Sequence, residues 1–366
     1  MPLTKGPQQT GAGDAVSVRL LPGLALDFAA RVGRGAYATC LRRDLCFHGF
    51  VAVYAMLALA VSLAAGVPAK FAPFSYLGLV SALPRVLLLL VAGAGLWSLG
   101  SRSPLRTFRG LLAACFGPHT VAGLLLFASL SVFLGVFTSL KTMLSDMIPF
   151  FADPALAHAD AWLHGGDPWR YTSALLPAPW TAGLERLYFG FWGILLSGCL
   201  LAVLLLPRLR EVRAQYVWTF LWMYPVLGNL AAGAVMSAGP VYYEQVTGDP
   251  RFSALVQYLA QHSIGREWAA ALWNSYVSGA VGVGSGISAF PSLHLANAAM
   301  FALLAGRIHQ RLGWLAAAFA GVVLFGSVHL GWHYAVDGYF AIAATVLIWK
   351  LVGKVLQRAS GAAPSR

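Results

Sequence analysis

The sequence predicts an all-α fold, a polytopic membrane helix bundle of about eight spans. The first observation is composition: 58% of the 366 residues are hydrophobic and only 10% are charged, whereas a soluble domain carries roughly 25% charged residues. The second is eight apolar runs, each close to the roughly 20 residues that a helix needs to cross a bilayer. The third is that Lys and Arg gather in alternate connections between these runs.

The same composition excludes several classes of protein. A soluble fold could not bury this much apolar surface, and a disordered chain would not carry it. The formal net charge of +12 would suggest nucleic acid as the partner of a soluble protein. In a membrane protein it reports basic cytoplasmic loops, so we expect membrane lipids and no nucleic acid as partners. The four cysteines form neither a metal-type pair nor a disulfide-dense pattern.

The eight predicted spans leave room for two long loops and for a segment at each end. They are residues 46–66, 80–100, 119–140, 184–206, 216–238, 292–309, 312–330 and 334–352. The second is interrupted near its start by Pro84 and Arg85. Residues 1–45 lack the apolar core of a signal peptide. Within them, residues 20–32 can form a helix lying in the membrane interface or a weakly ordered tail.

The positions of Lys and Arg orient the bundle. With the N-terminus in the cytoplasm, 18 of the 25 Lys and Arg residues fall in cytoplasmic segments and seven on the other side, in line with the positive-inside rule. An even number of spans then places both termini in the cytoplasm. The long loops at about 141–183 and 239–291 face outward, as does a short turn near 331–333, so these segments converge on one membrane face.

The strongest chemical candidate lies at this outward turn. Asp337 is the single acid in or beside the last three predicted spans, and His333 stands four residues before it. On a helix the two residues share one face, where a carboxylate can accept a hydrogen bond from one imidazole nitrogen and leave the other free to attack. A structural polar pair that closes a helix end is the alternative for any such His/Asp spacing.

A second candidate opens the sixth predicted span. Pro291 and Ser292 suit a helix start, where a missing N–H costs nothing and a hydroxyl can cap. His294 then lies in the first turn, and a free helix N-terminus favours a phosphate group. The glycine-rich residues 279–286 that precede it can bring backbone N–H groups to an anion, although a plain loop explains them equally.

Residues 290–294 (FPSLH) and 333–337 (HYAVD) together resemble the type-2 phosphatidic acid phosphatase superfamily. Because Leu stands between Ser and His, they resemble more closely its inositol-phosphorylceramide-synthase-like branch. The resemblance implies a catalytic core of six helices. It divides the chain into a cytoplasmic or interfacial segment (1–45), two accessory spans and a loop (46–118), the six-span catalytic core (119–352) and a cytoplasmic tail (353–366).

The resemblance also implies roles for the site residues. His333 is expected to be the nucleophile that forms a phosphohistidine, Asp337 to orient it and stabilise its charge, and His294 to protonate the leaving oxygen. Phosphoryl transfer needs a nucleophile and an acid placed in this way, and cationic groups around the equatorial oxygens. Side chains and N–H groups can supply that charge, so neither a metal nor another cofactor is expected.

The sequence departs from the phosphatases where they carry cationic motifs. Their Lys and Arg-Pro motif has no clean copy here, and the position of their arginine six residues before the nucleophile holds Ser327. The phosphate-binding cations must therefore come from other outward residues. Arg251 is the first choice, and Ser292 at the helix start is a further substrate-binding candidate. The other outward choices are Arg170, Lys141 and Arg266, of which Arg170 is the second candidate.

A metal site is a minor possibility. His329, His333 and Asp337 stand at four-residue intervals, but on a continuous helix the outer two lie about 12 Å apart. They cannot then share an ion whose ligands lie at about 2 Å. Only a helix break at Gly331 would bring the three together.

These features predict an integral membrane phosphatase or phosphotransferase that acts on a lipid phosphate through a phosphohistidine at the extracytoplasmic face. From the resemblance we expect a bacterial inner membrane, with the site facing the periplasm. One alternative is an intramembrane serine protease with Ser285 as nucleophile. Another is a proton-coupled transporter in which His333 and Asp337 relay a proton.

Overall fold

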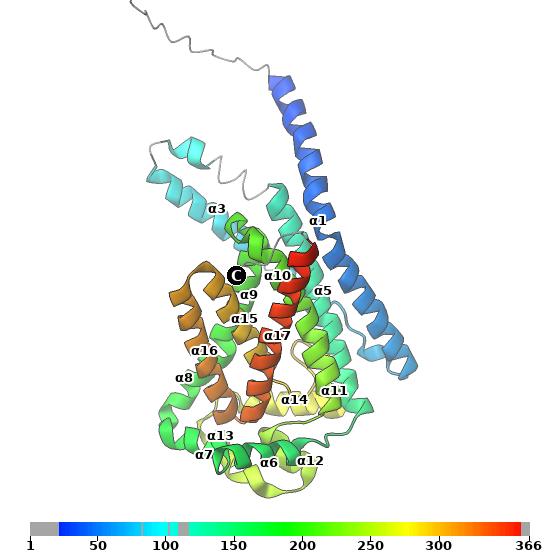
Figure 1. Ribbon diagram of the computed structural model, residues 1–366, viewed down its shortest axis with the longest axis vertical. Helices are drawn as coiled ribbons and strands as arrows, with labels where there is room; N and C mark the ends of the chain where they lie inside the picture. The colour runs from blue at the N-terminus through cyan, green and yellow to red at the C-terminus, as the bar shows by residue number, and fades with distance from the viewer. Residues whose placement is uncertain (1–21, 82, 102, 109–116, 360–366) are drawn as a thin grey trace, which may run out of the picture.

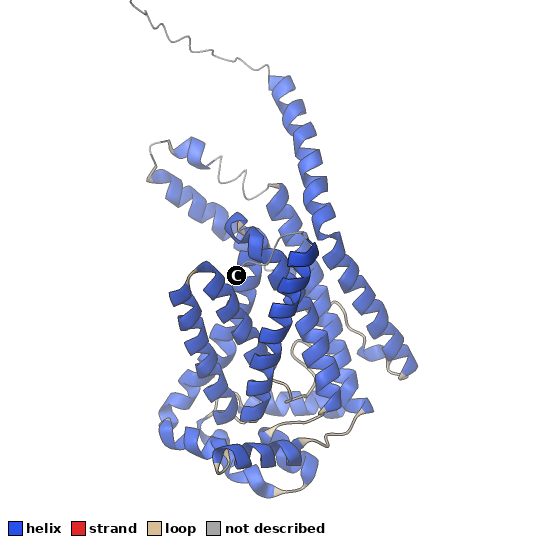
Figure 2. Cartoon of the chain, in the orientation of Figure 1, coloured by secondary structure: helices blue, strands red, loops and turns tan. Residues whose placement is uncertain are grey.

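The computed structural model describes residues 22–359 except 82, 102 and 109–116, and within these ranges the regular structure is entirely helical (Figure 2). The longer helices are α1 (Pro22–Ala64), α3 (Leu83–Leu99), α5 (Pro118–Met147), α6 (Asp153–His164), α7 (Pro168–Leu175), α9 (Trp192–Leu205), α10 (Arg210–Pro225), α13 (Ser253–His262), α14 (Arg266–Ser278), α15 (Leu293–Ile308), α16 (Gln310–His329) and α17 (Ala335–Ala359). The shorter ones are α2 (Leu77–Ser81), α8 (Thr181–Glu185), α11 (Ala232–Ala234) and α12 (Tyr243–Thr247).

The helical segments of the central bundle run side by side (Figure 1). They are α5, α8 with α9, α10 with α11, α15, α16 and α17. Helix α5 packs against α1 and α9, and α15 packs against both α16 and α17. Fully buried aromatic rings such as Phe133 and Phe220, whose centroids are 6.0 Å apart, fill the space between α5 and α10. The prediction of an all-α membrane helix bundle is confirmed.

Five helices among the described residues are long and apolar enough to cross a membrane: Gly35–Ala64, Pro118–Met147, Ala178–Leu205, Gln310–His329 and Ala335–Ala359. Each contains or overlaps one predicted span. These helices fit a membrane protein, but they do not bear out all eight predicted spans.

The other three predicted spans also form helices, but these are too short or not apolar enough to be among the five. The span at 80–100 begins in α2 and continues as α3, which has 17 residues. The span at 292–309 forms α15, with 16 residues. The span at 216–238 lies in the helical residues 210–234, where polar and aromatic residues such as Tyr224 and Asn229 lower the mean hydropathy.

A buried ion pair ties the N-terminal helix to the bundle. Arg213 on α10 donates to both carboxylate oxygens of Asp44, at 2.6 and 2.7 Å, and both side chains are buried. Such bidentate ion pairs fix the relative position of two helices. Asp44 lies within α1, which continues through residues 45 and 46. The boundary predicted between these two residues therefore falls inside a helix.

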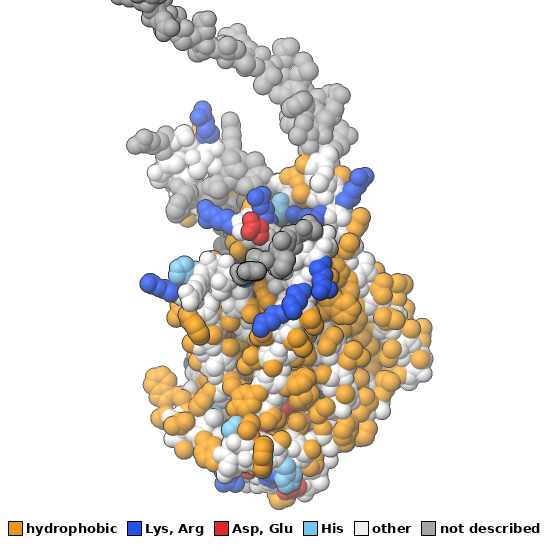
Figure 3. All heavy atoms as spheres, viewed as in Figure 1, with side chains coloured by type: hydrophobic (Ala, Val, Ile, Leu, Met, Phe, Trp, Pro, Cys, Tyr) orange, Lys and Arg blue, Asp and Glu red, His pale blue; other side chains and the backbone are white. Residues whose placement is uncertain are grey.

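The two ends of the bundle differ in composition. Helices α6, α7, α12, α13 and α14 gather at one end, while α1 begins and α17 ends at the other (Figure 1). Figure 3 shows Lys and Arg side chains at this second end and a hydrophobic belt between the two. Exposed basic residues there include Arg42, Arg43, Lys350 and Lys354. The ends of the described chain therefore lie on one side of the belt, opposite the helices formed by the long loops.

Candidate active site

His333 lies in a short link between α16 and α17. Gly331 has a φ of +69°, in the left-handed region that favours glycine, and it breaks the helical path as the sequence suggested. The N–H groups of Trp332 and His333 then donate to the carbonyl of Ser327, at 3.0 and 3.2 Å. Ser327, which stands where the phosphatases carry an arginine, therefore supports the link through its backbone.

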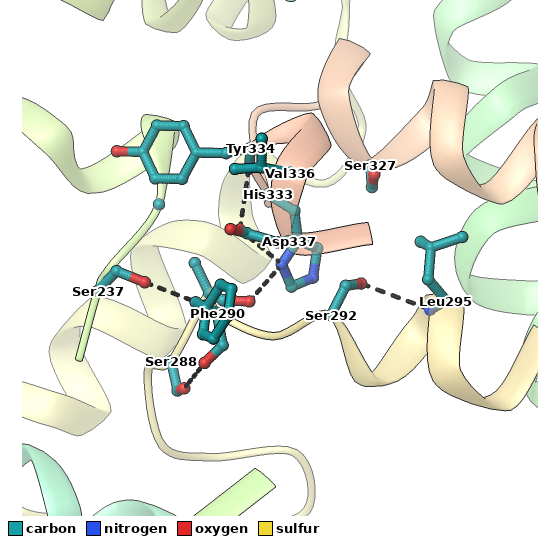
Figure 4. Close-up of polar contacts among 12 residues, drawn as sticks. Ser237, Ser288, Phe290, Ser292, Leu295, Ser327, His333, Tyr334, Val336 and Asp337 are labelled. Carbon is teal, nitrogen blue, oxygen red and sulfur yellow. Dashed lines mark hydrogen bonds and ion pairs between the residues drawn. The ribbon is translucent and has the colours of Figure 1, made fainter. Parts of the chain in front are cut away.

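The ring of His333 is oriented by a backbone carbonyl. Its Nδ1–H donates to the oxygen of Ala289 at 2.7 Å, while the nearest oxygen of Asp337 is 3.6 Å away (Figure 4). The latter distance is too long for a hydrogen bond. The expected bond from the imidazole to Asp337 is thus corrected, although the buried carboxylate remains close enough to act on the ring's charge. With the proton on Nδ1, the lone pair is on Nε2.

Asp337 is fully buried in the first turn of α17, where it accepts a hydrogen bond from the N–H of Tyr334 at 3.0 Å. It thereby caps the start of its own helix. The structural alternative for the His/Asp spacing is realised in part, because Asp337 closes a helix end and also lies beside the histidine.

His294 faces the same cavity from the first turn of α15. Its ring stacks on Tyr188, with centroids 4.5 Å apart and 12° between the planes, and packs against Trp192 at 4.2 Å. Trp192 also donates its indole N–H to the His294 carbonyl, at 3.0 Å. The ring centroids of His294 and His333 are 6.4 Å apart. The structure therefore brings together two histidines that lie 39 residues apart in the sequence.

Both histidines line a cavity of about 740 Å³. Its walls are largely aromatic and apolar, and residues 282–286 of the glycine-rich loop form one side. The aromatic residues in the lining are Tyr188, Phe189, Tyr242, Trp268 and Trp332. A cavity of this size and character suits an amphiphilic ligand that places one polar group against a few convergent side chains.

Lys141 is the one Lys or Arg among the described residues that line this cavity. It lies near the C-terminal end of α5 and forms no hydrogen bond or ion pair with any residue in the described ranges. The loop packs closely on it, since a Cβ at Gly286 would lie 3.1 Å from Cγ of Lys141. A lysine without a partner beside two histidines provides the positive charge that a phosphate needs.

The other predicted substrate-binding residues are not brought to the cavity. Arg251 donates to Asp167 at 2.7 Å and to the carbonyl of Ala157 at 3.1 Å. Arg170 is 62% exposed and lies 3.9 Å from the same aspartate. Ser292 is fully buried as the N-cap of α15 and accepts from the N–H of Leu295 at 3.4 Å. Substrate binding by these three residues stays a prediction.

His329 points away from the two catalytic candidates. Its Nε2 lies 3.1 Å from the hydroxyl of Thr181, and its ring stacks on Phe325. No group of three possible metal ligands occurs in the part of the chain that the structure describes. The break at Gly331 therefore separates His329 from His333 instead of joining them around an ion.

Two buried carboxylates next to the site were not predicted from the sequence. Asp153 accepts from the N–H groups of Ala238 and Gly239, each at 2.8 Å, and Asp160 from those of Ala335 and Val336, at 2.7 and 2.9 Å. Burial raises the pKa of both carboxyl groups, against the effect of these donors. Their spacing of seven residues on α6, which places both on one helix face, is the signal that could have pointed to them.

Two turns of π-helix also border the cavity. Residues Arg186–Phe191, between α8 and α9, contribute Tyr188 and Phe189, and residues Val226–Ala231, between α10 and α11, contribute Gly228. Such wide turns often occur at functional sites because they shift side chains out of the regular helical register. Here the first of these turns carries Tyr188, whose ring stacks on His294.

The comparisons with known proteins agree with this geometry. The family model of the PAP2 superfamily, that of the type-2 phosphatidic acid phosphatases, matches residues 154–351. The matched range contains both histidines and Asp337, whereas Lys141 and α1 to α5 precede it. No curated protein and no solved structure matches the chain.

Proposed function

The chain belongs to the PAP2 superfamily, whose family model covers residues 154–351 of its 366, and on this premise we propose that it is an integral membrane phosphatase or phosphotransferase that acts on a lipid phosphate through a phosphohistidine. Membership supports a phosphatase-type function. The inositol-phosphorylceramide-synthase-like branch is the finer part of the proposal, and it rests on residues 290–294.

The single observation that carries the proposal is the pair of histidine rings, 6.4 Å apart by their centroids, in one cavity with Lys141. In the first step Nε2 of His333 attacks the phosphorus, the P–N bond forms and the P–O bond to the leaving group breaks. His294, in its protonated form, gives its proton to the departing oxygen. In the second step the oxygen of water or of a hydroxyl acceptor attacks the phosphorus and gives its proton to His294. The new P–O bond forms, the P–N bond to His333 breaks, and phosphate or the phosphorylated acceptor leaves.

The surrounding charges suit these steps. As Nε2 bonds to phosphorus, the imidazole becomes positive, and the buried carboxylate of Asp337, 3.6 Å from Nδ1, stabilises that charge. The bond from Nδ1–H to Ala289 keeps the proton on the nitrogen that does not react. Lys141 lies beside the negative oxygens of the phosphoryl group, where a fixed cation lowers the barrier.

Neither alternative function is favoured. Ser285 lines the cavity, but its hydroxyl donates to the carbonyl of Gly282 at 2.9 Å and lies 3.3 Å from that of Thr142, and it forms no bond with a histidine. A serine nucleophile requires such a base. For a transporter, a proton relay would need further ionisable groups along the bundle. The buried carboxylates of Asp153 and Asp160 instead accept hydrogen bonds from backbone N–H groups.

The test of this proposal is release of free phosphate from phosphatidic acid by the purified protein in detergent. We expect His333→Ala to reduce turnover by about 10³-fold or more and His294→Ala by about 10²- to 10⁴-fold. His262→Ala is the matched control, because His262 is exposed on α13 and lies outside the cavity lining.

Repeating the assay with a hydroxyl acceptor separates a phosphatase from a transferase. Equal activity in the wild type and in all three variants would overturn the catalytic assignment.

A further inference from the structure

Asp153 occupies an unusual position for a carboxylate. It lies at the start of α6, is completely buried and does not line the catalytic cavity. It accepts three hydrogen bonds: from the N–H groups of Ala238 and Gly239, each at 2.8 Å, and from the hydroxyl of Tyr334 at 2.9 Å. Three donors converging on one buried carboxylate fix the segments that carry them.

The first of these segments continues to the carbonyl that orients the nucleophile. Ser237, next to Ala238, accepts the N–H of Ala289 at its carbonyl, at 2.8 Å, and the N–H of Phe290 at its hydroxyl, at 3.0 Å (Figure 4). Ser237 therefore holds the peptide whose carbonyl accepts the Nδ1–H of His333. The position of this acceptor depends on the same segment that Asp153 holds.

The second segment is the nucleophile's own. Tyr334 follows His333 directly, and its hydroxyl points to Asp153. Hydrogen bonds and chain connections thus form a closed ring that includes the bond from His333 Nδ1–H to the Ala289 carbonyl. The ring runs through Asp153, Ala238, Ser237, Ala289, His333 and Tyr334. The Asp153 carboxylate binds the segment that holds the acceptor carbonyl and the residue that follows His333, but it does not bind the imidazole itself.

We infer that Asp153 is a positioning residue for the phosphoryl-transfer step, because it holds the Ala289 carbonyl and the His333 imidazole in register. This inference rests on the proposed function, which makes His333 the nucleophile. If this ring of bonds is opened, the His333 imidazole can rotate relative to the Ala289 carbonyl. Its Nε2 is then no longer aligned with the phosphorus. A misplacement of about 1 Å can cost about 10²-fold in rate.

The position of Gly239 supports the same conclusion. Gly239 has a φ of +94°, and a Cβ there would lie 2.7 Å from the carbonyl oxygen of Trp332. The segment held by Asp153 thus runs in backbone contact with the residue before His333. Contact on both flanks of the nucleophile leaves the link little freedom to move.

The test uses two variants that open the ring at different points. Tyr334→Phe removes only the phenol–carboxylate bond, and Asp153→Asn replaces one acceptor oxygen with an amide. Tyr224→Phe is the matched control, because its hydroxyl accepts a buried hydrogen bond from Asn297 outside the cavity lining. The rate of phosphohistidine formation and KM are measured per folded protein, alongside thermal unfolding.

We expect the rate to fall by about tenfold in Tyr334→Phe and up to about 10²-fold in Asp153→Asn. KM should stay within about twofold, as expected when an interaction made only in the transition state is lost. Tyr224→Phe should keep the wild-type rate. Wild-type rates per folded molecule in both ring variants, or a rise in KM with an unchanged rate, would overturn the inference.

A second readout separates this inference from the proposed function. In protein labelled with ¹⁵N-histidine, the hydrogen-bonded Nδ1–H of His333, assigned with His333→Ala, should give a signal that weakens or shifts in both ring variants. An unchanged signal would overturn the inference. If the signal changes in both ring variants but the wild-type protein forms no phosphohistidine, the positioning role stands and the proposed function is overturned.

Discussion

At the scale of single residues, the sequence located the two candidate histidines better than the groups that contact them. His294 and His333 were predicted from their motifs, and the structure places their rings in one cavity. The acceptor for Nδ1–H is the carbonyl of Ala289 and not Asp337. A backbone carbonyl is present at every residue, so no sequence pattern distinguishes this one. Only the fold decides which carbonyl meets the imidazole.

The phosphate-binding cation is a residue-scale question that the structure sharpens. Lys141 lines the cavity without a partner among the described residues, whereas Arg251 is engaged by Asp167. Replacing Lys141 with Ala should lower kcat/KM for phosphatidic acid by about 10- to 100-fold, since a hydrogen bond to a charged group is worth about 1.5–3 kcal/mol. Steady-state kinetics on folded protein measures this.

Arg251→Ala is the comparison, because it removes the cation that the sequence favoured. We expect its kcat/KM to stay close to that of the wild type. A larger loss in Arg251→Ala than in Lys141→Ala would assign the phosphate to the arginine instead.

At the scale of elements, hydropathy predicted the five helices that are long and apolar enough to cross a membrane, but it did not predict the parts that position the site. Helix α6 falls in a long predicted loop, yet its buried Asp153 and Asp160 fix the ends of segments distant in sequence. The two π-helical turns, at Arg186–Phe191 and Val226–Ala231, are likewise invisible to an apolar pattern. Each depends on tertiary packing, which the period of hydrophobic residues does not encode.

Asp160 is predicted to stabilise the start of α17 from outside that helix. Its carboxylate accepts the N–H groups of Ala335 and Val336, as an N-cap residue would. Asp160→Ala leaves these two donors without an acceptor and should lower the free energy of unfolding by about 1–3 kcal/mol. Thermal unfolding in detergent, with a lower midpoint for the variant, measures the effect.

Glu244→Ala is the control for this prediction, because Glu244 is exposed and its carboxylate forms no bond within the described part of the chain. Equal midpoints for the two variants would show that Asp160 does not act as a cap.

At the scale of the whole molecule, composition predicted a membrane bundle, and the helical architecture agrees with it. It could not predict how the accessory N-terminal region meets the core. Tyr76, in the connection between α1 and α2, accepts the N–H of Gly284 at 2.9 Å, across 208 residues of sequence. The accessory region therefore touches the loop that lines the cavity. A contact between segments so far apart in sequence carries no local signature.

The orientation of the bundle is a whole-molecule prediction. The basic end of the molecule should face the cytoplasm and the end that holds α6 and α13 should face the periplasm. A reporter active only in the periplasm should be on when fused near residue 260 and off when fused near residue 210. The reverse pattern would invert the topology and place the candidate site on the cytoplasmic side.

The central claim is that His333 carries the phosphoryl group. The most direct measurement is to mix the protein with phosphatidic acid labelled with ³²P in its phosphate, quench with base, and map the label by peptide. The account predicts base-stable, acid-labile label on the peptide that contains His333, and none in His333→Ala. Turnover of the lipid with no label on this peptide, or with equal label in His333→Ala, would contradict it.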